Sequence, residues 1–498
     1  MDLTGTLRDN GFPIGIVRGL LGGLVPCSAA EAHSFGQLYT LPIPVTMYVY
    51  AAAAVLLVSF LMIGLFASGK GIEKNFVVVR RWLRRPAPRR GTRWVSVCRF
   101  ASVCCMFSVI AAGLVGSDNA YQNVSMTLFW ILFVLGMTYL CAAVGDIYEV
   151  INPWRVVVDA LERSAPGTFA GRRPWPTSWA CYPALFLFIV FIWVELFAHM
   201  TPRTLAAALS LYTLLNVGGA WLFGRAAWFR QGEFFGYYFH LVGKMAPLQR
   251  ESGPDGKHLI VVRHPFIALL NERPTHISQV LFVLFMLSST AYDGIKDTEL
   301  WMGIFWRDFH RAMMPLMGGD IVATYAIFQA AFKVYQALAI PAFLGLYLVV
   351  YLAFIWLSKC VVKSTTSTFD LACRYAFTLI PIALVYNLSH YYTLALAQGA
   401  QLYRLASDPL GYGWNLFGTA RRPVDFFLDV ELVWHSQVWL IIAGHIVSVY
   451  LAHLRALEDA PPGRAALGQL PVLLLMVALT GLGLWILSLP IQAGVAVG

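Results

Sequence analysis

Long apolar stretches recur along this chain, separated by short polar segments. A helix needs roughly 20 apolar residues to cross the hydrocarbon core of a bilayer, which is about 30 Å thick. This pattern predicts an all-α fold, a polytopic membrane bundle of about ten transmembrane helices. The predicted spans are residues 45–67, 98–117, 126–146, 179–200, 205–224, 275–292, 335–358, 373–397, 435–456 and 468–490.

The composition excludes an ordinary soluble protein. Of 498 residues, 58% are apolar and 12% are charged, whereas about a quarter are charged in soluble domains. The net charge of +10 does not indicate nucleic acid, because nine Lys and Arg crowd into residues 69–94 beside an apolar span. Such a run is a topology signal that also suits anionic lipids. We therefore expect the lipid bilayer as a partner and no nucleic acid; the sequence leaves protein partners unknown.

The distribution of Lys and Arg predicts the orientation. If the first span runs from outside to inside, the inner segments hold 26 Lys and Arg and the outer segments hold 8. Positive residues favour the cytoplasmic side, so the bundle has a basic inner face and both chain ends face outward. In a bacterium, this describes a multi-pass inner-membrane protein with periplasmic termini.

The N-terminal segment is a candidate for export and removal. Arg8 and Arg18 precede the short apolar run Gly19–Val25, and Ala30-Glu31-Ala32 after it resembles a signal-peptidase site. Residues 1–32 are thus a possible cleaved signal segment, with 33–498 as a single integral-membrane domain. The alternative is an uncleaved interfacial segment.

Short segments between the spans predict caps and a hairpin. Residues 293–334 are amphipathic and Trp-rich, which predicts a helix lying across the outer surface. Residues 398–434 contain turn-forming strings and predict an outer cap. At the inner face, residues 250–264 carry a Gly-Pro-Asp-Gly turn before an apolar run and predict a small hairpin.

Ionisable residues within spans are costly and are therefore functional candidates. Glu195 and His199 are four residues apart, which places them on one face of the fourth span. His390 lies about 10 Å below the outer end of the eighth span, with Tyr386 one turn before it as a partner that could orient its ring. His445 lies about 15 Å below the outer end of the ninth span, a depth that His390 could meet.

Two further candidates have structural interpretations. His453 is about 12 Å deeper than His445 and about 80° round the helix, so we place it at the inner edge. Asp146 and Glu149, in GDIYEVINPWR, are paired carboxylates at the inner end of the third span. We interpret them as anchors of the helix end rather than as acid and base.

A metal site would have to be assembled across helices, because H-x-x-x-H, H-E-x-x-H and E-x-x-H patterns are missing from the sequence. The predicted ligands are Glu195, His390 and His445, with Asp293 near the mouth. Imidazole and carboxylate together suit zinc, manganese or iron. P-loop, Rossmann and G-x-S-x-G motifs are also missing, which disfavours nucleotide-driven and hydrolase-fold chemistry.

Several strings together resemble a known family: AHSFGQLYTLPIP, GDIYEVINPWR, WVELF, STAYDGI, YNLSHYYTLALAQG, DPLGYGWNLFGTA and GHIVSVYLAHLRAL. They are similar to bacterial integral-membrane proteins called fenitrothion hydrolases, over residues 32–456. The resemblance implies a phosphoric triester hydrolase that converts a lipophilic organophosphorus triester into an aryl alcohol and a dialkyl (thio)phosphate. It carries over no residue roles.

Metal-assisted hydrolysis is compatible with the candidate residues, because a bound metal activates water and stabilises charge on phosphorus ligands. We assign His390, His445 and Glu195 as metal ligands, and Glu195, Asp293 and Tyr386 as catalytic candidates. A transporter or channel with an intramembrane His/Glu site is the main alternative. Haem held by His390 and His445, or copper held by a new N-terminus at His33, are further alternatives.

Overall fold

The computed structural model describes residues 44–66, 85–86, 91–252, 258–318, 320–422, 429–459 and 465–488. The predicted signal segment 1–32 and the Gly-Pro-Asp-Gly turn lie outside these residues, as does most of the basic run 69–94.

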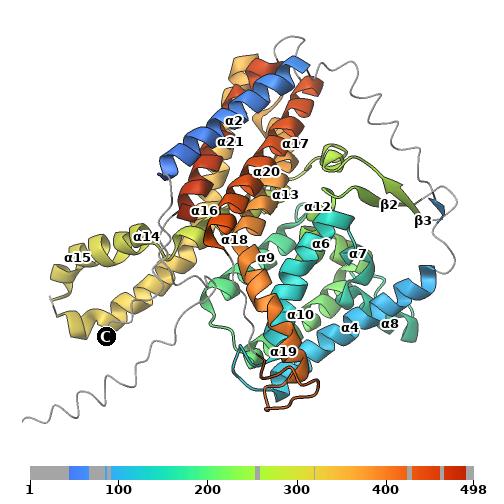
Figure 1. Ribbon diagram of the computed structural model, residues 1–498. Coiled ribbons are helices and arrows are strands. Elements are labelled where there is room, and N and C mark those ends of the chain that lie inside the picture. Colours follow the sequence, from blue (N-terminus) through green and yellow to red (C-terminus); the bar gives the residue numbers. More distant parts are fainter. Residues whose placement is uncertain are drawn as a thin grey trace, which may run out of the picture.

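The described residues confirm the all-α membrane bundle. They contain nine helical segments long and apolar enough to cross a membrane. The remaining predicted span, 179–200, forms a shorter apolar helix, α9 (Tyr182–Phe197), of 16 residues. The other principal helices are α2 (Val45–Phe66), α4 (Gly91–Val115), α6 (Met137–Val144), α8 (Pro153–Ser164), α10 (Pro202–Phe223), α12 (Phe234–Gly243), α13 (Ile277–Ile295), α16 (Ile321–Val362), α17 (Thr368–Ala376), α18 (Ile380–Ala400), α20 (Val430–Asp459) and α21 (Ala465–Ser488), shown in Figure 1.

Short helical segments connect or interrupt these helices. They are α5 (Val124–Met126), η2 (Thr127–Gly136), α7 (Tyr148–Ile151), α11 (Arg225–Ala227), η3 (Trp228–Gly232), η4 (Ile267–Leu270), α14 (Glu299–Gly303), η5 (Ile304–Phe309), α15 (His310–Met313), η6 (Met314–Met317), η7 (Phe377–Leu379) and α19 (Leu402–Ser407). The segments η2, η3 and η5 are π-helical. Wide helical turns of this kind are rare and are often found at functional sites.

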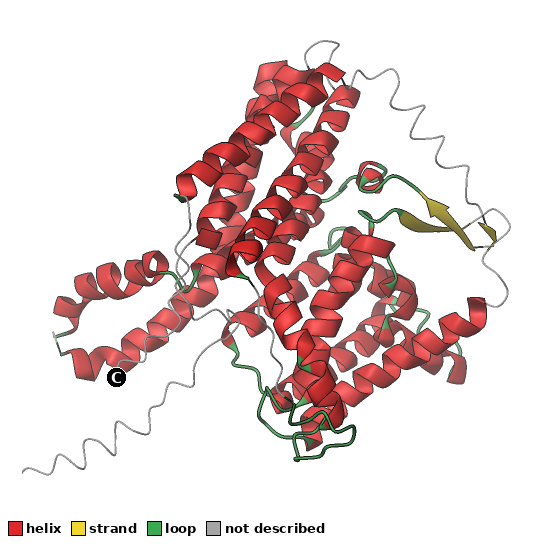
Figure 2. Ribbon diagram, in the orientation of Figure 1, coloured by secondary structure: helices red, strands yellow, loops and turns green. Residues whose placement is uncertain are grey.

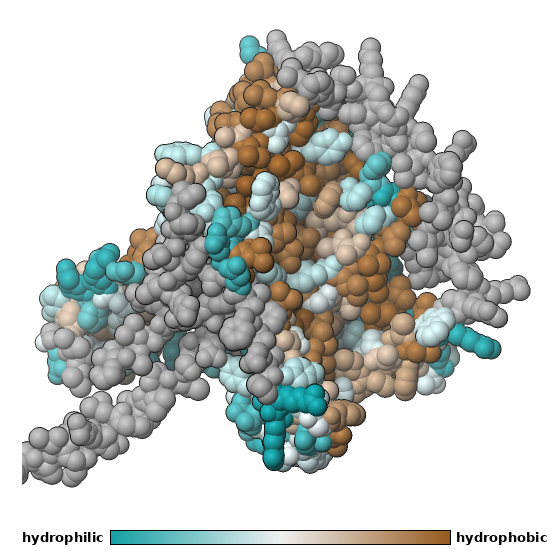
Figure 3. All heavy atoms as spheres, in the orientation of Figure 1, coloured by the Kyte–Doolittle hydropathy of each residue, from teal (hydrophilic) through white to brown (hydrophobic). Residues whose placement is uncertain are grey.

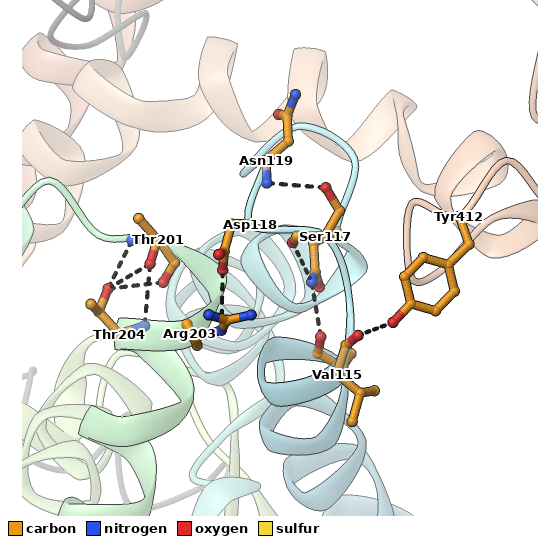
Figure 4. Close-up of polar contacts among 10 residues, drawn as sticks. Val115, Ser117, Asp118, Asn119, Thr201, Arg203, Thr204 and Tyr412 are labelled. Carbon is orange, nitrogen blue, oxygen red and sulfur yellow. Dashed lines mark hydrogen bonds and ion pairs between the residues drawn. The ribbon is translucent and has the colours of Figure 1, made fainter.

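The loops at one end of the bundle form the cap face, which comprises residues 116–123, 198–201 and 401–422 with α14 and α15. Asp118 forms an ion pair of 3.6 Å with Arg203, and the Tyr412 hydroxyl donates to the Val115 carbonyl (Figure 4). Thr201 caps α10 in a reciprocal arrangement with Thr204. These contacts tie three connections that are distant in sequence into one surface, as expected for the cap predicted at 398–434.

The opposite end is the hairpin face, which comprises α7, α8, α17 and a small sheet. β2 (Leu248–Ser252) and β3 (His258–Val262) pair antiparallel, and β1 (Arg85–Pro86) joins the other edge of β3. Figure 2 shows these strands beside the helices. The prediction of a hairpin over 250–264 is therefore confirmed.

The prediction of a surface helix over 293–334 is only partly right. Residues from Ile321 onward belong to α16, which has 42 residues and is therefore about 63 Å long, roughly twice the thickness of the hydrocarbon core. α14 and α15 run beside its first half, where Phe305 packs on Phe332 and His310 on Phe328 (Figure 1). The segment therefore forms an arm that extends from the bundle.

The outward sides of the helices are apolar, whereas polar groups gather inside and at the ends. Leu61, Phe100, Leu214 and Trp439 are each at least 60% exposed. Hydrophobic side chains cover much of the face in Figure 3. Because such surface is unfavourable in water, it is the side that faces lipid.

Candidate functional site

Asp293, near the end of α13, is the centre of a buried polar cluster. Its Oδ2 atom accepts a hydrogen bond of 2.8 Å from Nε2 of His390 and one of 2.6 Å from the Tyr391 hydroxyl, both on α18. Lys296 Nζ lies 3.5 Å from the other carboxylate oxygen. The side chains of Asp293, His390 and Lys296 are each 9% exposed. Two helices thus hold one carboxylate against three donors.

Lys296 follows the end of α13 and lies between two carboxylates. Its Nζ also contacts Oδ2 of Asp297. Burial alone would lower the pKa of Lys296, but the charges and hydrogen bonds of Asp293 and Asp297 outweigh burial and raise the pKa overall. Lys296 therefore remains a cation at neutral pH and balances one of the two carboxylates.

A cavity of about 50 Å³ borders this cluster; we call it the Asp293 cavity. Glu195 from α9 lines it together with Asp293, Asn387 and Tyr391. Oδ1 of Asn387 is buried and has no hydrogen-bond partner within the described chain. At about 15 Å³ for each water, the cavity has room for about three water molecules.

A second cavity, of about 20 Å³, lies on the other side of His390 and is also lined by Tyr386 and Gly483. The Tyr386 hydroxyl donates to the Leu479 carbonyl of α21. A Cβ at Gly483 would collide with the Tyr386 ring, so the glycine permits this approach. Tyr386 is therefore hydrogen-bonded to α21 and does not orient His390, as we predicted it would. The partner that orients His390 is Asp293.

His445 lines neither cavity. It is fully buried on α20, its Nδ1 lies 2.8 Å from the Ile441 carbonyl, and its ring meets the Tyr386 ring edge-on at 5.8 Å. Within the described residues, no group of three or more His, Cys, Asp or Glu side chains could hold a metal ion. The set Glu195, His390 and His445 does not fit a metal site here, because His390 Nε2 bonds Asp293 and His445 lies against Tyr386.

The structure also shows where two other predicted residues, His199 and Asp146, lie. His199 does not share a helical face with Glu195, because α9 ends at Phe197 and His199 has a left-handed φ of 42°. Asp146 follows the break at Gly145, accepts from the Glu149 backbone N–H at 3.0 Å and contacts His240 at 2.8 Å. It thus anchors a helix end, as we interpreted it.

Residues 225–243 form a re-entrant segment. α10 ends at the hairpin face, and α12 starts inside the bundle and returns to that face, where Gly243 packs closely on Asp146. At the end of α12 that lies deepest in the bundle, Phe234 and Phe235 pack against the Phe191 ring of α9 and are 3% and 4% exposed. Irregular backbone at such depth is tolerated only where protein or a cavity surrounds it.

Glu233 caps this re-entrant helix and is fully buried. Its carboxylate accepts four hydrogen bonds, from the Tyr212 hydroxyl (2.6 Å), the Asn152 amide (3.1 Å) and the backbone N–H groups of Phe235 (3.0 Å) and Gly236 (2.7 Å). None of these partners is a cation. The start of α12 adds a favourable dipole, which helps to offset the cost of burying the carboxylate.

A large cavity of about 910 Å³ opens at the hairpin face; we call it the hairpin-face cavity. Asn152 and Gly236, two partners of Glu233, line it, whereas Phe234 and Phe235 line the Asp293 cavity. The re-entrant segment therefore separates the two cavities, with Glu233 between them.

Three residues of this arrangement were not predicted. Lys296 is one turn from Asp293 and so had a signal in helical spacing. Tyr391 is adjacent to His390 and points about 100° away from it on the helix, so spacing gave no signal for it. Glu233 had a weaker signal, because its segment is too short to be recognised as a span.

The chain was compared with family models, curated proteins and solved structures. None matches it.

Proposed function

We propose that this protein moves protons across a membrane through the cluster at Asp293. The observation that carries the proposal is the Asp293 carboxylate, which His390, Tyr391 and Lys296 contact inside the bundle beside a small cavity that Glu195 also lines. Ionisable residues within spans are costly, and chains of Asp, Glu and His form the proton relays of many pumps and transporters. We take the membrane to be a bacterial inner membrane, with the hairpin face inward.

The dimensions of the Asp293 cavity favour protons over larger cargo at this point. About 50 Å³ accommodates water, whereas sites for drug-sized molecules occupy about 300 to 1,000 Å³. Water in this space would connect the Glu195 and Asp293 carboxylates, two groups that can accept a proton.

In this proposal, the proton path from the hairpin face to the Asp293 cavity passes through the re-entrant segment. A proton that enters the hairpin-face cavity meets Asn152 and Gly236, behind which lies Glu233. Interrupted helices with polar groups at mid-membrane are also how secondary transporters build their sites. Between Glu233 and the Asp293 cavity stand the rings of Phe234 and Phe235, which would have to move to admit water.

Hydrolysis of an organophosphorus triester is the second candidate. The Asp293–His390 pair supports it, since an imidazole oriented by a carboxylate can act as a general base. The small volume of the Asp293 cavity makes this the less favoured proposal. Gene-dependent release of a nitrophenol by membranes, measured with and without a chelator, tests both the activity and the predicted metal.

Proton movement is tested with the full chain in liposomes that contain a pH-sensitive dye. A potassium gradient with valinomycin imposes the membrane potential. The wild type should acidify or alkalise the interior according to the sign of the potential, and Asp293→Asn should reduce the rate about tenfold or more. Asp308→Asn is the matched control, because Asp308 is exposed and pairs with Arg307 on the arm.

A rate equal to that of protein-free liposomes, or an unchanged rate in Asp293→Asn, would contradict the proposal. The amount of each variant inserted in the liposomes is measured in parallel. This separates a defect in proton movement from a failure to fold.

A further inference from the structure

The hairpin-face cavity has charged walls in which every carboxylate is matched. Three acidic side chains line it, and each meets a basic one: Asp146 with His240 at 2.8 Å, Glu149 with Arg155 at 3.8 Å, and Glu272 with Lys244 at 2.7 Å. Glu149 and Glu272 are thus paired with permanent cations, and Asp146 is paired with an imidazole.

Two guanidinium groups remain after this pairing. Arg230, in η3, and Arg273, before α13, also line the cavity and are exposed there. Neither forms an ion pair within the described residues. The charge of Arg230 does reach Glu272, but the direct partner of that carboxylate is Lys244. The cavity therefore offers two guanidinium groups that no described carboxylate contacts directly, and its permanent cations outnumber its carboxylates by four to three.

Aromatic side chains form another part of the wall. Phe229 and Tyr237 are 9% and 8% exposed, and Trp175 is half-buried. A preference for positive residues at the cytoplasmic face accounts for the number of Lys and Arg at this end of the bundle. It does not account for two arginines that line a cavity together with aromatic rings.

We propose that the hairpin-face cavity binds an organic anion that carries an apolar, aromatic-sized group, with Arg230 and Arg273 as the residues that bind its charge. A volume of about 910 Å³ lies within the range of small-molecule sites. Guanidinium groups bind planar or tetrahedral oxyanions through two parallel hydrogen bonds. This anion site goes beyond the proposed function and does not depend on it.

Binding is tested with the full chain in phosphatidylcholine nanodiscs, by calorimetric titration with naphthalene-2-sulfonate. Saturable binding is expected. The uncharged analogue naphthalene-2-sulfonamide, and the variants Arg230→Gln and Arg273→Gln, should each show affinity about tenfold lower. Arg311→Gln, which removes a charge from α15 on the cap face, should bind like the wild type.

Absence of saturable binding, or equal affinity in all three arginine variants, would overturn the proposal. A lipid headgroup is the other source of such an anion, so a second arm uses nanodiscs with phosphatidylglycerol. If that lipid competes with the sulfonate in the wild type and not in the Arg230 and Arg273 variants, the anion site is supported and the headgroup is its occupant.

The proton measurement described above contains no sulfonate, so the two proposals fail separately. Loss of sulfonate binding with normal proton movement overturns only the anion site. Normal binding with no proton movement overturns the proposed function and leaves the anion site.

Discussion

His390 and Asp293 are 97 positions apart in the chain, yet Nε2 of His390 lies 2.8 Å from Oδ2 of Asp293. The same oxygen accepts from Tyr391, so consecutive residues of α18 converge on one atom of α13. A residue pair (i, i+1) points in directions about 100° apart on a helix, and both directions can reach Asp293 only because α13 packs closely beside α18. The cluster thus joins two spans through polar contacts in a place where lipid could not satisfy them.

Tyr391→Phe tests the contribution of this junction to stability. The substitution removes one hydroxyl that donates to Asp293 and leaves the ring in place. We expect a loss of about 1 to 3 kcal/mol, because a buried carboxylate loses a charge-assisted hydrogen bond. Thermal unfolding in detergent measures it as a lower melting temperature. Tyr325→Phe, at a side chain that is 55% exposed on α16, should leave the melting temperature unchanged, and equal effects of the two substitutions would contradict this account.

The fold could be predicted from apolar length alone wherever a helix crosses the bundle regularly. This rule works because bilayer thickness fixes the length of a span. It fails at the re-entrant segment 225–243, which enters and leaves at one face, and at α16, where one helix continues beyond the predicted span at 335–358. In both places packing against neighbouring helices decides the path, and apolar length carries no information about it.

The candidate site was predicted less completely. The free-energy cost of an ionisable side chain within a span singles out Glu195, Asp293 and His390 as candidates. The structure groups these three residues around the Asp293 cluster and its two cavities. Depth along a helix also selects His445, but depth does not specify the direction in which a side chain points. His445 faces Tyr386 and Ile441 instead. The sequence therefore does not give the rotation of each helix about its own axis, because this rotation depends on tertiary packing.

The orientation of the bundle stays a prediction, based on the 26 to 8 distribution of Lys and Arg. Single cysteines introduced within 298–325 and 402–430 should react with a membrane-impermeant reagent added to intact cells. Cysteines within 75–93 and 250–262 should react only after the membrane is opened. Labelling of the second group in intact cells would reverse the orientation, and N-terminal sequencing of the mature chain tests removal of residues 1–32.

The ion pair between Glu272 and Lys244 at the hairpin face should make the stability of the fold depend on pH. Burial raises the pKa of its carboxyl, but the hydrogen bond and charge of Lys244 lower it more, so the pKa lies below its usual range. The ion pair therefore stabilises the fold above the ordinary glutamate pKa of about 4.3, and this stabilisation is lost as pH falls through the lower folded value. The side chain of Glu272 is 59% exposed, so solvent screens the effect and we expect it to be small.

Glu272→Gln should lower the melting temperature at pH 7, and the difference from the wild type should close as pH falls below about 4. Glu299→Gln, on the cap face, should match the wild type at both pH values. A difference for Glu272→Gln that stays constant with pH would show that Lys244 is not the cause.

Gly236→Ala tests the capping of the re-entrant helix. A Cβ at Gly236 would lie 2.6 Å from Oε2 of Glu233, so the carboxylate would have to move away from the Asn152 amide or from the helix start. Glu233 is fully buried and cannot find water instead. We expect a destabilisation of about 1 to 3 kcal/mol. Gly218→Ala in α10 is the control, since its added Cβ meets nothing within 4 Å and removing a helical glycine should stabilise by up to about 1 kcal/mol. The two substitutions, identical in chemistry, should therefore shift the melting temperature in opposite directions, and a stabilising Gly236→Ala would mean that the Glu233 carboxylate does not occupy the start of α12.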